Sequence, residues 1–243
     1  MAIGNAGDEP SKQGAIQAAR ALLGDWLQAS IGAEAGAWLA EALAPTEDRQ
    51  AIDLAFGLAP RRLGKRSLSD DAERRAHAAA LLPGWDPSLW AVDEAARVLI
   101  AAQAADVDGA TLDRLARHAD IAEQVALYRG LPLYGPQLDL HDLLGRGLRT
   151  HATPVFQAIA HRNPWPAAHL DEHRWNHLVL KALFMEISLT PLIGLQARAN
   201  PALSRMAQDY ADERRAAGRQ VPDDLWHCVR PEDTPHTRPG QAA

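Results

Sequence analysis

The sequence predicts an all-α protein, either a single irregular helical bundle or a short α-solenoid-like stack of about ten to twelve short helices. The chain of 243 residues contains 48 alanines, and alanine has the highest helix propensity. Phe and Tyr number only three each, and β-branched residues are sparse, so the residue types that favour strands are scarce. Apolar residues also recur at helical spacing between closely spaced Gly and Pro breaks.

The first helix is expected over 12–29, where Ile16, Leu23 and Trp26 share the apolar stripe. Further helices are expected at 33–43, 47–57, 70–82, 91–105, 110–119, 121–129, 137–149, 154–161, 171–187, 201–217 and 222–228. Helices and connections this short must pack against their sequence neighbours, which favours a bundle or a stack. No repeat of fixed length stands out, so one irregular domain is favoured over a regular array.

A break in the pattern near Pro60 suggests how the chain is divided. We predict a helical N-terminal subdomain over 1–60, a basic linker over 61–69 and a main helical domain over 70–230. The segment 231–243 is rich in Pro and polar residues and is expected to be a disordered tail.

Composition excludes several classes of function. The formal net charge is −6 and no basic run occurs, which argues against a nucleic-acid partner. No stretch approaches the roughly 20 apolar residues of a transmembrane segment, and the polar opening Met1–Gln13 lacks a secretion signal, so a cytoplasmic protein is expected. Cys228 is the lone cysteine, which excludes an intramolecular disulfide and a multi-cysteine metal site. No cofactor is expected, because glycine-rich phosphate loops are missing.

Lysine is rare, with three Lys against 22 Arg, and Lys181 lies within the strongly apolar segment 171–187. On a helical wheel apolar residues cover most of the circumference, and the polar gap holds only His177, Lys181 and Arg174. Lys181 either extends to the surface and pairs with a carboxylate, or anchors an anionic ligand as an amine of lowered pKa. Asn176 falls among the apolar positions, so its amide should be buried and hydrogen-bonded, most simply as a bond between two helix ends.

Three histidines, at positions 169, 173 and 177, are spaced by four residues. A pair such as His173 and His177 could share a metal, as helical i, i+4 histidines do in zinc sites. However, Leu170 follows His169 where a zincin motif would have glutamate. A solvated or helix-capping role is therefore favoured, with metal binding as the alternative.

The segment 201–217 carries Arg214 inside its apolar stripe, four residues after Tyr210. A buried guanidinium needs either an internal partner such as Asp209 or Glu213, or a ligand carboxylate or phosphate. The two carboxylates could also act as general acid and base, although no recognisable nucleophile accompanies them.

Several ordered motifs are typical of one family. They are Gly84-Trp-Asp-Pro87, Val92-Asp-Glu-Ala-Ala-Arg97, Ala126-Leu-Tyr-Arg-Gly-Leu-Pro132, His161-Arg-Asn-Pro-Trp-Pro166, Trp175-Asn-His-Leu-Val-Leu-Lys-Ala-Leu-Phe184, Gly194-Leu-Gln-Ala-Arg-Ala-Asn200, Asp209-Tyr-Ala-Asp-Glu-Arg-Arg-Ala-Ala-Gly-Arg219 and Leu225-Trp226. Through these motifs, residues 80–230 resemble the EboA family of bacterial metabolite-traffic proteins. The family tends to have Trp where Arg215 stands and Gly-Pro where Arg230-Pro231 stands, and the first 60 residues match it weakly.

The resemblance implies a cytoplasmic member of the Ebo gene cluster. The cluster also encodes a prenyltransferase-like membrane protein, a hydrolase of the TatD type, a sugar-phosphate-cyclase-like enzyme and sugar-isomerase-like proteins. It is linked to making or exporting a secondary metabolite, including movement of a pigment precursor to the periplasm. The resemblance thus indicates a pathway, with no catalytic assignment for this member.

We therefore expect an accessory protein, without catalytic activity, that binds a small anionic metabolite or another protein of the cluster. The candidate binding residues are Asn163, Trp175, Asn176, Lys181, Arg198, Asp209, Tyr210, Glu213, Arg214 and Arg219. One alternative is an enzyme acting on a cyclitol, sugar-phosphate or prenyl intermediate, with Lys181 and the Asp209/Glu213 pair as acid and base. Another is a helical scaffold for the cluster's membrane protein.

Overall fold

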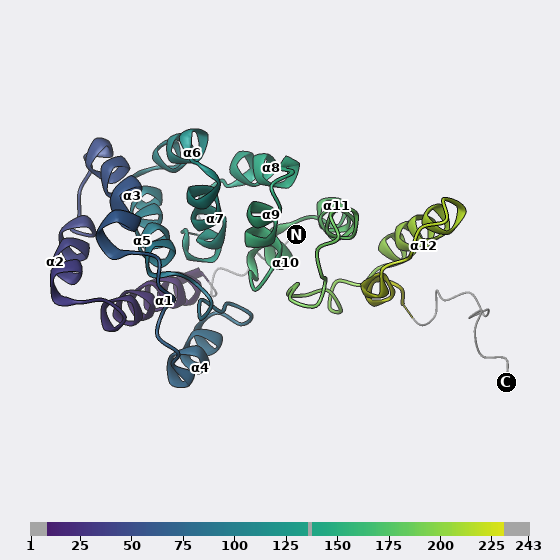
Figure 1. Cartoon of the computed structure of the whole chain (residues 1–243), viewed down its shortest axis with the longest axis horizontal. Coiled ribbons are helices and arrows are strands. Elements are labelled where there is room, and N and C mark those ends of the chain that lie inside the picture. The colour runs from purple at the N-terminus through teal and green to yellow at the C-terminus, as the bar shows by residue number, and fades with distance from the viewer. Residues whose placement is uncertain (1–8, 136–137, 231–243) are drawn as a thin grey trace, which may run out of the picture. The chain divides into compact units, whose positions relative to one another are not determined.

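The structure is a computed structural model that describes residues 9–135 and 138–230 (Figure 1). This part of the chain contains twelve α-helices, two short 3₁₀ helices and no strand, so the predicted all-α fold is confirmed. None of the described helices has both the length and the apolar character that crossing a bilayer requires. The predicted tail at 231–243 lies outside the described residues.

The chain forms two compact units that divide after Pro164. Unit 1 contains α1 (Glu9–Ala29), α2 (Ala33–Ala42), α3 (Arg49–Leu63), α4 (Ala72–Leu81), α5 (Val92–Val107), α6 (Gly109–His118), α7 (Ile121–Arg129), η1 (Leu131–Leu133), α8 (His141–Arg149) and α9 (Thr153–Ala160). Unit 2 contains α10 (Trp165–His169), α11 (Glu172–Phe184), α12 (Pro201–Ala216) and η2 (Asp223–Cys228).

Helix α5 is the centre of unit 1 (Figure 1). It contacts α1, α3, α6 and α7, and residues on every side of it are buried. Many of these are alanines, whose small side chains let neighbouring helices approach closely: Ala95, Ala96, Ala101, Ala102 and Ala104. Residues from the first third of the chain therefore share one core with later helices.

The division after Pro164 lies far from the predicted linker at 61–69. Helix α3 continues through Pro60 to Leu63, which is buried, and Gly64 ends it with a φ of 77°. Because α1 and α3 pack on α5, the described part of the predicted N-terminal subdomain, residues 9–60, belongs to the same compact unit as the helices that follow it. The burial of Leu63 holds the last turn of α3 in place. The prediction of a linker rests on the proline and arginine content of this segment, which does not reveal that burial.

Local capping chemistry sets the helix starts of unit 2. Asp171 accepts a hydrogen bond from the backbone N–H of Arg174 at 2.7 Å and so caps α11. Asn200 caps α12 directly before Pro201, as the sequence indicates. Helix α11 ends at Phe184, three residues before the predicted end, and Glu186 follows with a φ of 55°.

Candidate functional site

The ten predicted ligand-binding residues do not all lie in one unit. Nine lie in unit 2, whereas Asn163 belongs to unit 1. The buried Asn163 donates from Nδ2 to the carbonyls of Tyr128 at 3.0 Å and Ala158 at 3.1 Å. These bonds connect α7 and α9 and give Asn163 a structural role.

Asn176 and Asn200 form a reciprocal amide pair in unit 2. Asn176 is 3% exposed, and each Nδ2 donates to the other side chain's Oδ1, at 3.2 and 2.9 Å. The Asn200 Oδ1 also accepts from the Leu203 N–H, so the pair joins α11 to the start of α12. Asn176 is thus buried and hydrogen-bonded, as the wheel predicts, although it lies inside α11 and only its partner Asn200 is at a helix end.

Arg198 and Trp175 form a second contact in unit 2. The Arg198 guanidinium lies 4.9 Å from the Trp175 ring centroid, and its Nη1 donates to the Ala167 carbonyl at 3.0 Å. The Trp175 ring is fully buried, and its Nε1 finds no acceptor in the described part of the chain. Cation–π contact and backbone bonding hold Arg198 in place here.

Arg214 is satisfied within unit 2 by partners other than the predicted ones. Its Nη1 donates to the Tyr210 hydroxyl at 2.9 Å, its Nε donates to the Gln220 carbonyl at 2.5 Å, and Nη2 lies 3.8 Å from Glu186 Oε1. The carboxylate beside Arg214 is therefore Glu186 rather than Asp209 or Glu213. The reason is that both predicted partners lie on the exposed side of α12.

The predicted acid and base residues have different surroundings. Lys181 is half-buried on α11, and this burial lowers the pKa of its amine, while Asp209, Glu213 and Arg219 are exposed. Whether Lys181 faces a ligand or a carboxylate stays a prediction. Cys228 is buried, which raises the pKa of its thiol to about 12 and makes it a poor nucleophile at neutral pH.

The three histidines that are spaced by four residues do not lie on one helix. His169 lies on α10, where its ring stacks on Trp165 and its Nδ1 is 3.0 Å from the Trp165 carbonyl. His173 and His177 are exposed on α11, with their Nε2 atoms 3.2 Å apart. The described residues contain no group of three or more His, Cys, Asp or Glu side chains that could hold a metal.

A groove of about 920 Å³ lies in unit 1, between α1, the α2–α3 connection, α5 and the start of α6. We call it the Arg20 groove. Its lining combines apolar residues with polar ones: Gly24, Leu43, Pro45, Leu99, Ala102 and Val107 with Arg20, Thr46, Glu47, Arg49, Gln103, Asp106 and Asp108. This volume is in the range of small-molecule sites in proteins.

Two polar side chains of the Arg20 groove retain unused hydrogen-bonding atoms. The Arg20 side chain is 10% exposed; its Nε donates to the Leu133 carbonyl at 2.7 Å and its Nη1 to Asp106 at 2.5 Å. Gln103 donates from Nε2 to the Ala44 carbonyl at 2.6 Å. Among the described residues, Arg20 Nη2 and Gln103 Oε1 are buried and have no partner, which is rare for such atoms.

The charges around the Arg20 groove are largely paired. Asp106 lies on Arg20, and Asp108 accepts from Arg49 at 2.5 Å. Hydrogen bonds from Thr111 hold the pKa of the Asp108 carboxyl below its usual value, so it is ionised at neutral pH. With Glu47 counted, three carboxylates face two arginines, and the groove carries a negative formal charge.

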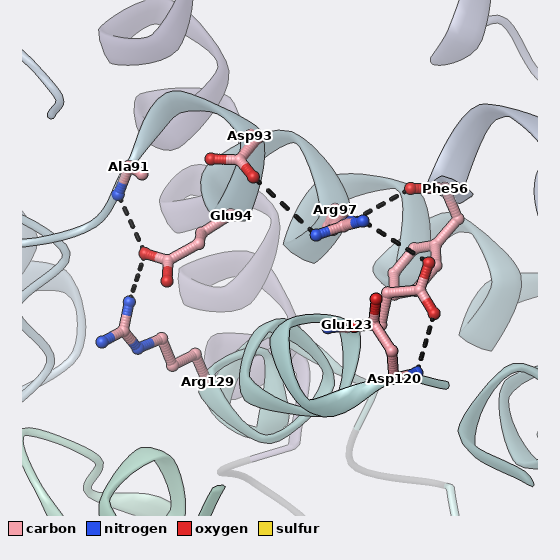
Figure 2. A network of polar contacts seen from close by, with 8 residues as sticks. All are labelled: Phe56, Ala91, Asp93, Glu94, Arg97, Asp120, Glu123 and Arg129. Atoms are coloured by element: carbon pink, nitrogen blue, oxygen red, sulfur yellow. Dashed lines mark hydrogen bonds and ion pairs between the residues drawn. The ribbon is translucent and has the colours of Figure 1, made fainter. Parts of the chain in front are cut away.

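A buried ion network joins α3, α5 and α7 (Figure 2). The Arg97 side chain is 4% exposed and reaches Asp93 at 3.8 Å and Glu123 at 3.4 Å. Its Nε donates to the Phe56 carbonyl at 3.1 Å, and the guanidinium lies 5.6 Å from the Phe56 ring centroid. The network thus holds the central helix against two neighbours.

Pro60 explains why the Phe56 carbonyl is open to Arg97. Proline has no N–H, so it cannot donate to the carbonyl four residues earlier, which is that of Phe56. Arg97 supplies the donor that the helix lacks. The proline inside α3 and the arginine inside α5 therefore form one structural arrangement.

The acidic residues around this network are also used by the fold. Glu94 accepts from the Ala91 N–H at 2.9 Å and pairs with Arg129 (Figure 2). The Arg129 guanidinium also lies over the Trp90 ring. Burial raises the pKa of the Asp93 carboxyl despite the nearby guanidinium of Arg97. The motif at 92–97 is therefore a structural element of unit 1.

Sequence reasoning overlooked the Arg20 groove, although a signal for it exists. Arg20 lies four residues after Ile16 and three before Leu23, inside an apolar stripe, as Arg214 does in its own helix. Gln103 lies four residues after the buried Leu99. In α1 and α5, as in α12, a polar residue inside an apolar stripe therefore indicates a buried polar side chain.

Comparison with known proteins gives one family. Residues 19–230 match the family model described as metabolite traffic protein EboA. The match begins well before residue 80, so it covers the second half of α1 and every lining residue of the Arg20 groove as well as the later motifs. No curated protein and no solved structure matches the chain.

Proposed function

Because the chain belongs to the EboA family of metabolite traffic proteins, we propose that it binds a small molecule of its traffic pathway in the Arg20 groove. The observation that carries this proposal is the pair of buried, unused atoms in the described lining, the donor Arg20 Nη2 and the acceptor Gln103 Oε1. Both atoms are covered in the unbound protein, so a ligand must shift the side chains over them; hydrogen bonds to both would then remove the cost of leaving them unpaired.

The lining favours an uncharged or weakly cationic ligand with hydroxyl or amide groups and an apolar face. Leu43, Leu99 and Val107 offer apolar contact, while Arg20 and Gln103 offer one donor and one acceptor. The predicted anionic metabolite fits this groove less well, because Asp106 and Asp108 already pair with its two arginines. An anion would also be repelled by the three carboxylates of the lining, those of Glu47, Asp106 and Asp108.

The proposed role is accessory: the protein holds the molecule and passes it on, with delivery toward the periplasm as the destination. Paired arginines and an amide are groups that bind and orient, which supports holding over bond breaking. Other proteins of the Ebo cluster, including its membrane protein, are the proposed recipients.

Retention of a small molecule from cell extract tests the groove. The purified chain is incubated with extract of its own host, separated from free compounds by gel filtration, and analysed by mass spectrometry. We expect a compound that is retained by the wild type and reduced about tenfold or more by Arg20→Gln or Gln103→Leu, since each loses a buried hydrogen bond.

The matched control is Arg75→Gln, which alters an exposed arginine paired with Asp70 on another face of unit 1. This variant should retain the compound at the wild-type level. Equal retention by Arg20→Gln, or no retained compound in the wild type, would contradict the proposed site.

A deletion strain separates the proposed role from catalysis. Accumulated end product inside the cell indicates a traffic role, whereas an accumulated unreacted intermediate indicates an enzyme. Complementation by Arg20→Gln together with failure of Lys181→Met and Arg214→Ala would place the site in unit 2, at the residues that the sequence predicts.

A further inference from the structure

We infer that His173 and His177 form a two-histidine site for a divalent transition-metal ion on the exposed face of α11. This inference is independent of the Arg20 groove. The two residues are four apart on one helix, and their Nε2 atoms lie 3.2 Å from each other. Both side chains are exposed, so an ion can reach them from solvent.

The distance between the two nitrogens matches the geometry of a shared metal ion. Histidine nitrogens bind zinc at about 2.0–2.1 Å, which places two of them about 3.3 Å apart at a tetrahedral angle and about 2.9 Å apart at a right angle. The observed 3.2 Å between the Nε2 atoms of His173 and His177 lies between these values.

The two rings also bring their Nε2 atoms toward each other. Their centroids are 4.4 Å apart and their planes meet at 52°, so the Nε2 atoms are closer to each other than the ring centres are. Small rotations of the two side chains would be enough to aim both nitrogens at one ion. Without an ion, one ring must carry the proton on Nε2 and donate it to the other, and a metal ion would take the place of that proton.

The helix holds the pair in position before any ion binds. Asp171 caps the first turn of α11, and Trp175 and Leu178 are buried on another face of the same helix. The backbone at positions 173 and 177 is thus fixed, and binding orders only two imidazole rings. Little conformational entropy is lost on binding.

Imidazole pairs suit Cu²⁺, Ni²⁺ and Zn²⁺, and the usual order of stability places Cu²⁺ first and Mn²⁺ far below. Mg²⁺ prefers oxygen ligands and should not bind. With two protein ligands, the ion keeps open positions for water or for donor atoms of another molecule.

Isothermal titration of the full chain tests this site. The protein carries no affinity tag, is stripped with a chelator, and is titrated with ZnCl₂ and, as a control, MgCl₂. We expect one Zn²⁺ per chain and no Mg²⁺, and we expect His173→Ala and His177→Ala each to weaken Zn²⁺ binding by at least about tenfold, because one ligand of two is lost.

His77→Ala is the matched control, since His77 is also an exposed helical histidine, and Leu81 lies four residues after it. This variant should bind Zn²⁺ like the wild type. Electron paramagnetic resonance with Cu²⁺ should show two nitrogen ligands in the wild type and one in each variant at positions 173 and 177. Absence of Zn²⁺ binding, or binding unchanged in His173→Ala and His177→Ala, would overturn the inference.

Discussion

Arg97 and Arg20 are both almost buried in unit 1, yet their surroundings differ. Arg97, with 4% of its side chain exposed, has a backbone carbonyl, an aromatic ring and two carboxylates around it. Arg20, with 10% exposed, has one carbonyl and one carboxylate, and its Nη2 lacks a partner among the described residues. Burial alone therefore does not show whether all the donors of an arginine are satisfied. The acceptors around each guanidinium have to be counted.

The largest expected effect is that of Arg97→Met. This change leaves the carboxylates of Asp93 and Glu123 without their cation and should lower the free energy of unfolding by about 3–5 kcal/mol. Urea unfolding followed by circular dichroism measures it. Arg75→Met, at an exposed pair with Asp70, should cost less than about 1 kcal/mol. A loss of similar size in both variants would mean that the network does not support the fold.

Arg20→Gln should cost less stability than Arg97→Met, about 1–2 kcal/mol, since it removes hydrogen bonds to Leu133 and Asp106. The Asp106 side chain is half exposed and remains hydrated when its partner is lost. The same urea measurement applies. A loss as large as that of Arg97→Met would assign Arg20 to the fold and weaken the case for a ligand.

Asp93→Asn tests the network by its pH dependence. Burial raises the folded-state pKa of Asp93, so folding favours the protonated carboxyl. The contribution of Asp93 to the free energy of unfolding is fully present below its unfolded-state pKa, and it is lost as the pH rises through its folded-state pKa. The stability of Asp93→Asn relative to wild type should therefore increase between pH 4 and pH 7, as measured by urea unfolding at several pH values. A difference that decreases over this range would contradict the raised pKa.

The smallest expected effect is that of Pro60→Ala. An interior helix proline ordinarily costs about 3 kcal/mol, partly through its missing N–H, but Arg97 already donates to the Phe56 carbonyl. Replacement by alanine also loosens the unfolded chain, so the free energy of unfolding should change by less than about 1 kcal/mol. In the double variant with Arg97→Met, alanine should recover part of the loss. If the free-energy changes of the two single substitutions simply add up in the double variant, Pro60 and Arg97 act separately.

Local chemistry made much of the fold predictable. The Asn200-Pro201 pair predicts the start of α12 correctly, because a cap depends on a few adjacent residues. The end of α11 was harder to predict, since apolar residues continue past Phe184 while the backbone turns at Glu186. The amide of Asn176 is buried as its wheel position predicts.

The candidate site was less predictable, because its parts come from distant segments. Arg20 meets Asp106 across 86 residues and the Leu133 carbonyl across 113 residues, and no sequence spacing encodes such pairs. In the same way, the carboxylate beside Arg214 is Glu186 from another segment rather than a neighbour on the same helix. Sequence patterns identify a buried cation, but they do not identify its partner.

The two contacts of Glu123 suggest the order in which parts of unit 1 fold. Its Oε2 accepts from the Asp120 N–H, three residues away, whereas its Oε1 meets Arg97, 26 residues away. Closing the short loop costs far less chain entropy than closing the long one, so the first turn of α7 can form before it docks on α5. Loss of the local cap should then slow refolding, while loss of Arg97 should mainly speed unfolding. One carboxylate thus links an early step of folding to a late one.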